Sequence, residues 1–409
     1  MTTDLVRKYR LLFAVPGLRL SAVAALTGKF QPGMYPVALL ALVSSHLDYS
    51  AATLVVAAAS VGAMTTPLRG RLLDRFSYAA VLWPLLVLHT GTLLLFVAGA
   101  RAHAGTAVLC CLSVLASVSL PPIGTLTRVM WRKAVPDDLR TTALALDSVL
   151  ADFGFMVGPV AAVALARGIT PDAAVLACGL LVAVAVPLGL RGAGARAPKE
   201  APPRRHRAGP LRSAALRRVF SVAFCFFLGV NVLEVSLASY GRKGEVTLAG
   251  GVLLSLIAVA SMAGGALLGG LPARAARRLL RPTVPLAGNA VCLLLLAAAS
   301  FVHPVLVPLA CLPVGFCLGP CFASVYGTAA DHAAKGEEAE TQSWVAGAMM
   351  AGGALGAAAG GWSLAHGGPA GALSLAAATW AAGAACGARI PHLRPAVEDA
   401  CVTSGAPAD

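Results

Sequence analysis

Charged residues are scarce in this chain of 409 residues, because Asp, Glu, Lys and Arg together make up only 12% of it. Soluble domains average about 25% charged residues, so the sequence excludes an ordinary soluble protein. Apolar residues make up 58% of the chain. They gather in runs of about 18 to 25 residues, long enough to cross a hydrocarbon core of about 30 Å as helices. A membrane β-barrel would need alternating polarity, so the sequence predicts an all-α integral membrane protein.

Motifs for ATP-driven pumping, hydrolysis and metal binding are also missing. The only Gly-Lys pair, Gly28-Lys29, has Val23 where a phosphate-binding loop begins with glycine and Phe30 where it needs Ser or Thr. Neither GxSxG nor HExxH occurs, and the ten cysteines include no CxxC pair, so we interpret them as small core residues. We therefore expect no enzymatic activity, no metal and no cofactor.

Twelve apolar runs between charged or Gly/Pro-rich breaks predict twelve transmembrane helices. Their expected ranges are 18–44, 50–69, 80–99, 105–131, 141–166, 172–190, 217–240, 246–270, 283–302, 305–330, 341–365 and 370–389. With the N-terminus inside, nearly all Lys and Arg fall in inner loops, and the outer loops carry Arg101, Arg167, Arg242 and Lys243. Basic loops stay in the cytoplasm, so we expect both termini there. The abundant Ala, Gly and Arg favour a bacterial cytoplasmic (inner) membrane.

The two halves of the chain share a pattern of backbone-shaping residues. At one constant offset, Pro122 coincides with Pro320, Gly154 with Gly352, Gly158 with Gly356, and Pro171 with Pro369. We interpret this match as a duplicated six-helix unit, with halves at 1-190 and 217-390, as is typical of secondary transporters. Between them we expect a basic linker at 191-216 that faces lipid head groups rather than nucleic acid, and after them a cytoplasmic tail at 391-409.

The loop after the second predicted helix reads GRLLDRFSYAAVL. Its Gly70, Asp74 and Arg75 are similar to the first signature of the major facilitator superfamily, and this resemblance implies a twelve-helix fold that works by alternating access. On physical grounds, Asp74 can pair with a cation or cap the N-terminus of a helix from another span. A contact made in one conformation alone biases the equilibrium between conformations, so we expect these residues to act in gating. The alternative is an ordinary solvated loop charge.

In the fifth predicted helix, GFMVGPVAAV resembles the signature of drug and proton antiporters through Gly154, Gly158 and Pro159. This resemblance implies the drug-efflux-like branch of the superfamily. Physically, the two glycines let a neighbouring backbone approach closely, and Pro159 removes a donor and bends the helix. The same spacing also serves as a plain packing face between helices, so both interpretations stay open.

Ionisable residues inside a membrane are costly and usually face a cavity or a partner. Asp152 lies about 18 Å along its helix from Arg140, near the membrane midplane. Asp147 falls on the face of Gly154, whereas Asp152 is rotated from that face by about 140°. We expect Asp152 to carry a coupling proton. The alternative is a carboxyl group fixed in an ion pair or a hydrogen bond.

Helices three and seven offer further polar candidates. Glu234 lies beside Asn231 beyond the midplane, and we expect this pair to bind protons or a cationic substrate. His89 is a candidate proton relay, although a lone histidine is more often a core residue.

Lys29 and Gln31 lie inside the first predicted helix. Lys29 is about 15 Å along the helix from Arg19, too far for its side chain to reach the membrane surface. We expect both residues near the central cavity, with Lys29 binding an anionic or carbonyl group of the substrate, or pairing with a carboxylate such as Asp152 or Glu234 when the site is empty. The alternative is a permanent ion pair that locks the first helix.

These observations together predict a secondary active transporter with proton-coupled efflux of a small, partly apolar compound. Its expected partners are that small-molecule substrate, protons and the lipid bilayer, and we expect it to act as a monomer. The alternatives are a solute importer or symporter of the same fold, and a non-transporting membrane receptor or scaffold.

Overall fold

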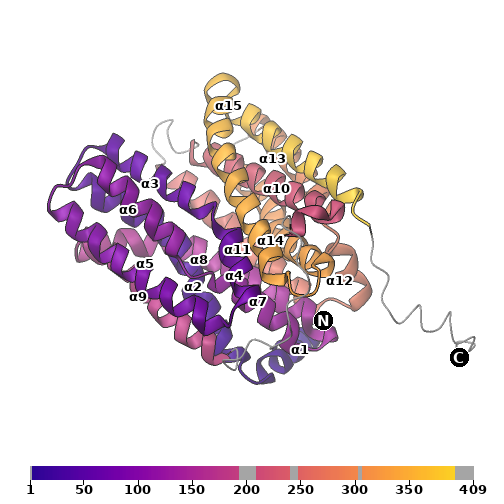
Figure 1. The fold of residues 1–409 in the computed structure, drawn as a ribbon. Coiled ribbons are helices and arrows are strands. Elements are labelled where there is room, and N and C mark those ends of the chain that lie inside the picture. The colour runs from indigo at the N-terminus through magenta and orange to yellow at the C-terminus, as the bar shows by residue number, and fades with distance from the viewer. Residues whose placement is uncertain (1, 193–208, 240–246, 303–305, 392–409) are drawn as a thin grey trace, which may run out of the picture.

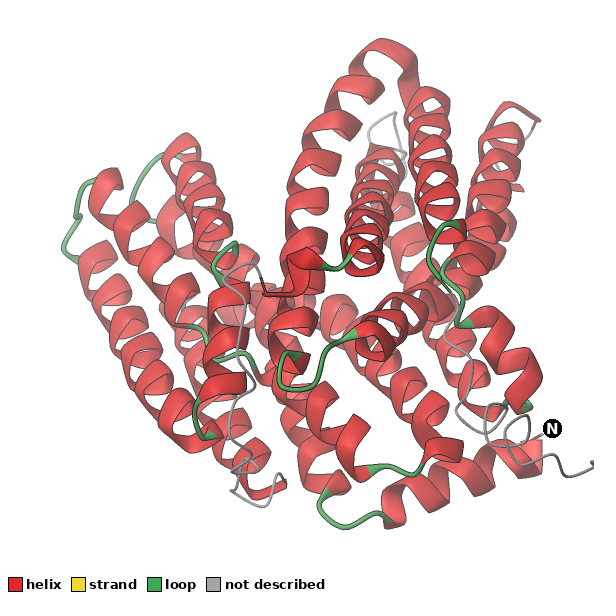
Figure 2. Cartoon of the chain, turned by 45° about the vertical axis from the view of Figure 1, so that its right-hand side comes forward, coloured by secondary structure: helices red, strands yellow, loops and turns green. Residues whose placement is uncertain are grey.

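A computed structural model describes residues 2–192, 209–239, 247–302 and 306–391. This part of the chain consists of helices joined by turns (Figure 1, Figure 2), which confirms the predicted all-α class. Residues 193–208 of the predicted linker and 392–409 of the predicted tail lie outside the described residues.

The helices follow the predicted spans closely. The first half contains α2 (Leu18–Ser44), α3 (Tyr49–Ala63), α4 (Thr66–Arg75), α5 (Tyr78–Arg101), α6 (Thr106–Ser119), α7 (Ile123–Ala134), α8 (Arg140–Gly168) and α9 (Pro171–Gly192). The second half contains α10 (Ala214–Ser239), α11 (Thr247–Gly270), α13 (Thr283–Val302), α14 (Leu306–His332) and α15 (Glu338–Ala388). The short elements are α1 (Thr2–Ala14), η1 (Asp137–Leu139), η2 (Gly209–Arg212) and α12 (Ala273–Leu279).

The number of apolar helices fits the predicted twelve. Among the described residues, nine helices are long and apolar enough to cross a membrane, or ten if α1 and α2 count as one bent span. The shorter apolar helix α13 adds another, and α15 combines two predicted spans.

Proline and glycine explain where the helices depart from the predicted ranges. The predicted span 105–131 is divided into α6 and α7 at Pro121 and Pro122, because proline lacks an N–H donor and disfavours a helical conformation in the residue before it. Two predicted spans run together as α15, which is interrupted by a kink at Gly368, where φ is 64°. Glycine adopts such a positive φ without steric cost.

No long apolar run in the sequence predicts α1 (Thr2–Ala14). This helix is bent by 98° from α2, and it packs against α11 in the other half. Lys8 Nζ donates to the Leu271 carbonyl oxygen at 2.8 Å, and the Tyr9 hydroxyl donates to the Ala266 carbonyl oxygen at 3.2 Å. The helix has 13 residues, too few to cross a membrane, so an analysis based on long apolar runs passes over it.

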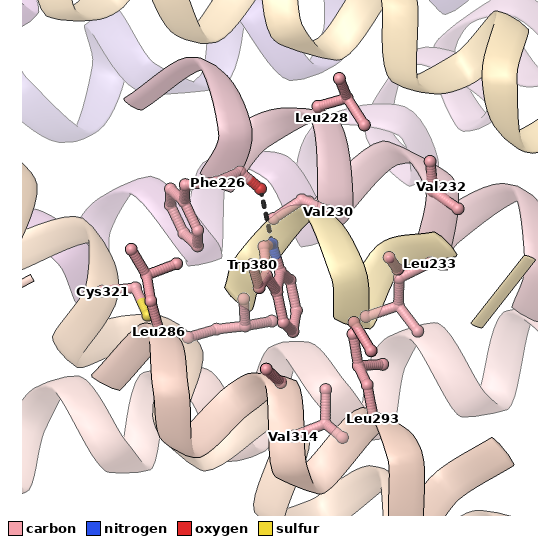
Figure 3. Close-up of a cluster of buried hydrophobic side chains, with 14 of the residues drawn as sticks. Phe226, Leu228, Val230, Val232, Leu233, Leu286, Leu293, Val314, Cys321 and Trp380 are labelled. Atoms are coloured by element: carbon pink, nitrogen blue, oxygen red, sulfur yellow. Dashed lines mark hydrogen bonds between the residues drawn. The ribbon is translucent and has the colours of Figure 1, made fainter. Parts of the chain in front are cut away.

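Each half has its own apolar core. In the second half, Trp380 is fully buried, and its Nε1 donates to the Phe226 carbonyl oxygen at 2.8 Å (Figure 3). The Phe226 ring meets the Phe322 ring edge-on, with centroids 4.9 Å apart, a favourable aromatic geometry. These contacts hold α10, α14 and α15 together as one packed unit.

The halves meet through a few helices. Figure 1 shows the indigo to magenta helices of the first half gathered beside the orange to yellow helices of the second. Across the interface, α8 packs against α11 and α14, and α4 packs against α15. Any residue on the inward faces of these helices is therefore placed to respond to relative movement of the halves.

Candidate transport site and gate

Four arginines mark one end of the helix bundle, which we call the basic end. They pair with carboxylates as Arg71–Glu340 (2.7 Å), Arg132–Asp331 (2.9 Å), Arg140–Asp137 (2.8 Å) and Arg212–Glu337 (3.6 Å). The first two pairs join the two halves of the chain, so the halves are in direct contact at this end.

Deeper in the bundle, Lys29, Asp147 and Arg128 form a buried cluster of charges. Lys29 Nζ lies 2.9 Å from Asp147 Oδ1 and donates to the Asp147 carbonyl oxygen at 2.9 Å. Arg128 Nε donates to Asp147 Oδ2 at 2.8 Å. The three side chains are 8%, 6% and 12% exposed for Lys29, Asp147 and Arg128. Two cations therefore share one carboxylate in a nearly dry environment.

Glycines bring α2 and α8 close enough for this cluster to form. A Cβ atom on Gly154 would lie 2.5 Å from the Lys29 carbonyl oxygen, and one on Gly33 would lie 2.6 Å from the Gly154 carbonyl oxygen. Gly158 faces the Gly33 backbone in the same way, at 3.0 Å. The glycines of the antiporter-like motif thus pack α8 against α2, and α8 continues as a helix through Pro159.

Lys29 pairs with a carboxylate, as the sequence predicts, but that carboxylate is Asp147 and not one of the two examples, Asp152 and Glu234. Asp147 is the partner because it lies seven residues before Gly154 and thus shares the helix face that meets α2. Asp152 is turned away from that face. The spacing was visible in the sequence, but the contact between α2 and α8 was not.

Arg128 extends the cluster into the second half of the chain. Its guanidinium carbon lies 3.6 Å from the centre of the Tyr326 ring on α14, a close cation–π contact. Arg128 lies within α7 and near the inner end of the predicted span 105–131, and nothing in the sequence marks it as a site residue.

Asp152 also touches the second half. The Ser261 hydroxyl on α11 donates to Asp152 Oδ2 at 2.6 Å, and the Asp152 residue is 9% exposed. This hydrogen bond links α8 to α11 about 18 Å along α8 from Arg140, deep in the bundle.

The other polar candidates lie apart from these contacts. Gln31 is buried in α2 at 2% exposure. His89 is fully buried, with its Nδ1 2.8 Å from the Ala116 carbonyl oxygen of α6. On α10, Glu234 is exposed, and Asn231 Nδ2 donates to the Phe227 carbonyl oxygen one turn earlier at 3.1 Å. His89 thus occupies a core position in the first half.

Gly70, Asp74 and Arg75, which the sequence predicts in a loop, lie on the helix α4 and form a junction with α15 at the basic end. Asp74 accepts hydrogen bonds from the backbone nitrogens of Ala339 (2.9 Å) and Glu340 (2.7 Å), and so caps the first turn of α15. Gly70 makes room for this approach, because a Cβ atom there would lie 2.5 Å from the Ala339 carbonyl oxygen. Arg75 is exposed, with its guanidinium 5.4 Å from the Phe76 ring centre.

Arg71 and Glu340 strengthen the same junction, and the sequence analysis did not single them out. Two nitrogens of Arg71 donate to the two carboxylate oxygens of Glu340, at 3.0 and 2.7 Å. Such a two-point ion pair is the strong geometry for arginine and carboxylate. In the sequence, both residues look like ordinary charges of inner loops. The sequence contains no feature that predicts the contact between α4 and α15.

A small pocket, with a cavity volume of about 40 Å³, lies between the charge cluster and the basic end. Arg128 and Asp147 line it together with Arg132, Arg140 and Gln342, and its apolar lining comes from Trp131, Ala143, Leu144 and Ala330. This volume is far below the range of about 300–1,000 Å³ that small-molecule sites occupy, so the pocket must widen to admit a ligand. Several cations line it.

Two packed helical halves with buried charges at their interface define a multi-pass membrane transporter. A family model for the Major Facilitator Superfamily matches residues 20–360, and the chain belongs to that family. Among curated proteins we find no match to the sequence.

Solved structures share this fold. The E. coli fucose:proton symporter FucP superposes with a TM-score of 0.70 at 15% identity, covering 92% of this chain and 98% of FucP. A bacterial homologue of the iron transporter ferroportin, in its outward-facing state, gives 0.72 at 16% identity, with 91% and 98% covered. The proton:xylose symporter XylE gives 0.71 at 12% identity, with 93% and 96% covered. These likenesses concern the fold.

Proposed function

We propose that this protein exports a small, partly apolar compound in exchange for protons, by alternating access across a bacterial cytoplasmic membrane. The distribution of Lys and Arg supports an orientation in which the basic end faces the cytoplasm. Contacts between the halves at that end support a form that is closed toward the cytoplasm. Export then requires these contacts to break, so that the substrate enters from inside.

The observation that carries this proposal is the hydrogen bond between Asp152 and Ser261. It joins the halves at a buried carboxyl group, and an ionised carboxylate in a membrane interior is costly unless it has partners. Separation of α8 from α11 removes one partner and changes the cost of ionisation. Proton occupancy of Asp152 and the relative position of the halves are thereby coupled.

The test uses inside-out membrane vesicles with an imposed proton gradient and a panel of radiolabelled amphiphilic compounds. Neutralisation by Asp152→Asn should abolish gradient-driven uptake into the vesicles while ligand-induced thermal stabilisation remains. The control is Asp138→Asn, an exposed carboxylate in η1, which should transport normally. Full coupled transport by the Asp152→Asn variant contradicts the proposal.

The direction of the gradient-driven flux separates export from import. Accumulation inside inside-out vesicles corresponds to export from the cell. Gradient-driven accumulation in right-side-out vesicles instead would identify an importer or symporter. Absence of gradient-driven flux for every compound would favour a receptor or scaffold.

A further inference from the structure

The charge cluster has an unbalanced charge. Lys29 and Arg128 carry two positive charges and share Asp147, so the cluster has a formal charge of +1 when all three are ionised. Burying a charge without a counter-charge is expensive. The contact between the Arg128 guanidinium and the Tyr326 ring offsets part of that cost, but an aromatic ring carries no net charge.

The adjacent pocket adds to the positive potential. Arg132 and Arg140 line it along with Arg128. Their own partners, Asp331 and Asp137, have side chains 59% and 84% exposed. Solvated ion pairs of this kind contribute little, so both arginines can reorient toward a ligand. Within the pocket lining, Asp147 is the one carboxylate, and Lys29 already neutralises it.

Part of the pocket lining is apolar. Trp131, Ala143, Leu144 and Ala330 lie within the same lining as the three arginines. A ligand that fits both parts needs an anionic group and an apolar body. A guanidinium has five N–H donors in a planar fork that matches carboxylate and phosphate oxygens, and Arg128 uses its Nε for Asp147.

We propose that the transported compound is an amphiphilic organic anion whose anionic group binds Arg128 in this pocket while Lys29 holds Asp147. The proposal rests on the transport function above, and it names the class of substrate. Because α7 and α8 contribute the cations while α14 and α15 contribute Ala330 and Gln342, the bound anion lies between the halves. Its charge balances the excess cation of the three-residue cluster, to which Asp152, a nearby carboxylate on α8, adds a counter-charge only when it is ionised.

The binding experiment uses the full chain in detergent and four probes that share one apolar body: 1-naphthoate, 1-naphthyl phosphate, 1-naphthamide and 1-naphthylmethylammonium. Affinities are measured by calorimetry and by the shift in unfolding temperature. At least one anion should bind more tightly than the amide and the amine, by about tenfold to a hundredfold, as expected for hydrogen bonds to a charged group. Comparison of the two anions separates carboxylate from phosphate recognition. Preference for the amide or the amine overturns the proposal.

Matched variants identify the residues that bind. Arg128→Gln leaves a neutral Lys29–Asp147 pair, and it should lower anion affinity by about tenfold or more while amide binding stays unchanged. Arg128→Lys should keep part of the anion affinity. Arg167→Gln, at an exposed site in the last turn of α8, should change nothing. Undiminished anion binding by Arg128→Gln overturns the proposal.

A second variant covers the case in which Arg128→Gln fails to fold. Lys29→Gln leaves a neutral Arg128–Asp147 pair that occupies the guanidinium, and it should weaken anion binding to a similar degree.

The experiments also separate this proposal from the proposed transport function. Anion binding without gradient-driven flux would support the anion site and contradict the proposal of an exporter. Gradient-driven flux of neutral or cationic compounds alone would support the proposal of an exporter and contradict the proposal that its substrate is an anion.

Discussion

Asp147 is the residue on which the buried charges depend most. Removing its charge by Asp147→Asn leaves Lys29 and Arg128 without a counter-charge, and loss of one partner from a buried pair costs about 3–5 kcal/mol. Lys29→Gln or Arg128→Gln removes the excess cation and leaves a neutral pair, so each should cost clearly less. Unfolding titrations in mixed detergent micelles measure these differences. Equal stability of all three variants would show that Asp147 does not hold the cations.

Lys29 should matter more for transport than for folding. Lys29→Ala keeps the pair of Arg128 with Asp147, so the protein should insert and fold, but Arg128 is then occupied and transport should fall strongly. Lys29→Arg restores a cation at the same place and should recover part of the flux. Vesicle transport normalised to the amount of folded protein gives the measurement. Undiminished flux through the alanine variant would assign Lys29 a purely structural role.

At the scale of elements, the approach of α2 to α8 depends on glycine. Gly154→Ala places a methyl group 2.5 Å from the Lys29 carbonyl oxygen, so the helices must separate, at a cost of about 1–3 kcal/mol for overpacking. The matched control is Gly91→Ala in α5, where no atom lies within 4 Å of the added methyl group. That control should stabilise the helix slightly, by about 0.5–1 kcal/mol. Unfolding titrations that rank the two variants in the reverse order would contradict the packing role.

The junction of α4 and α15 gives a second prediction at this scale. Asp74→Asn weakens the cap on α15, so the protein should shift toward a form open at the basic end. We expect Ser343, which is fully buried here, to become reactive when changed to cysteine in a background without reactive cysteines. Labelling by an impermeant maleimide in inside-out vesicles reports the shift.

Arg75→Gln is the control for that junction. Arg75 is exposed, so this change should leave the labelling rate of the cysteine at 343 unaltered. Equal labelling of the Asp74→Asn variant and the parent would remove Asp74 from gating.

The sequence predicts elements better than contacts between them. Apolar length places α2, α8 and α13 almost to the residue, because membrane thickness sets the helix length. The pairing of Lys29 with Asp147, and of Arg71 with Glu340, depends on how two helices are rotated and packed against each other. A single sequence does not specify that rotation, although the position of Asp147 on the glycine face was a usable signal.

At the scale of the whole molecule, the distribution of basic residues predicts the orientation. Reporter domains fused at either terminus, or inserted at residue 200 in the linker, should be active in the cytoplasm and inactive outside it. A reporter inserted in the loop after Arg101 should behave in the opposite way. An external signal from the linker would reverse the orientation and, with it, the assignment of the basic end to the cytoplasm.

The helix α1 has a practical consequence for handling the protein. It leads through a sharp bend into α2 of the first half, yet Tyr9 binds the backbone of α11 in the second half and Lys8 binds the backbone of Leu271 just after α11. In the proposed transport cycle, opening of the basic end would therefore detach α1 or carry it along with α11. An affinity tag or fluorescent protein attached before Thr2 adds mass and charge to α1, the helix that contacts both halves. Purification and single-molecule work on the transport cycle should accordingly leave the first residues native and place labels after Ile390.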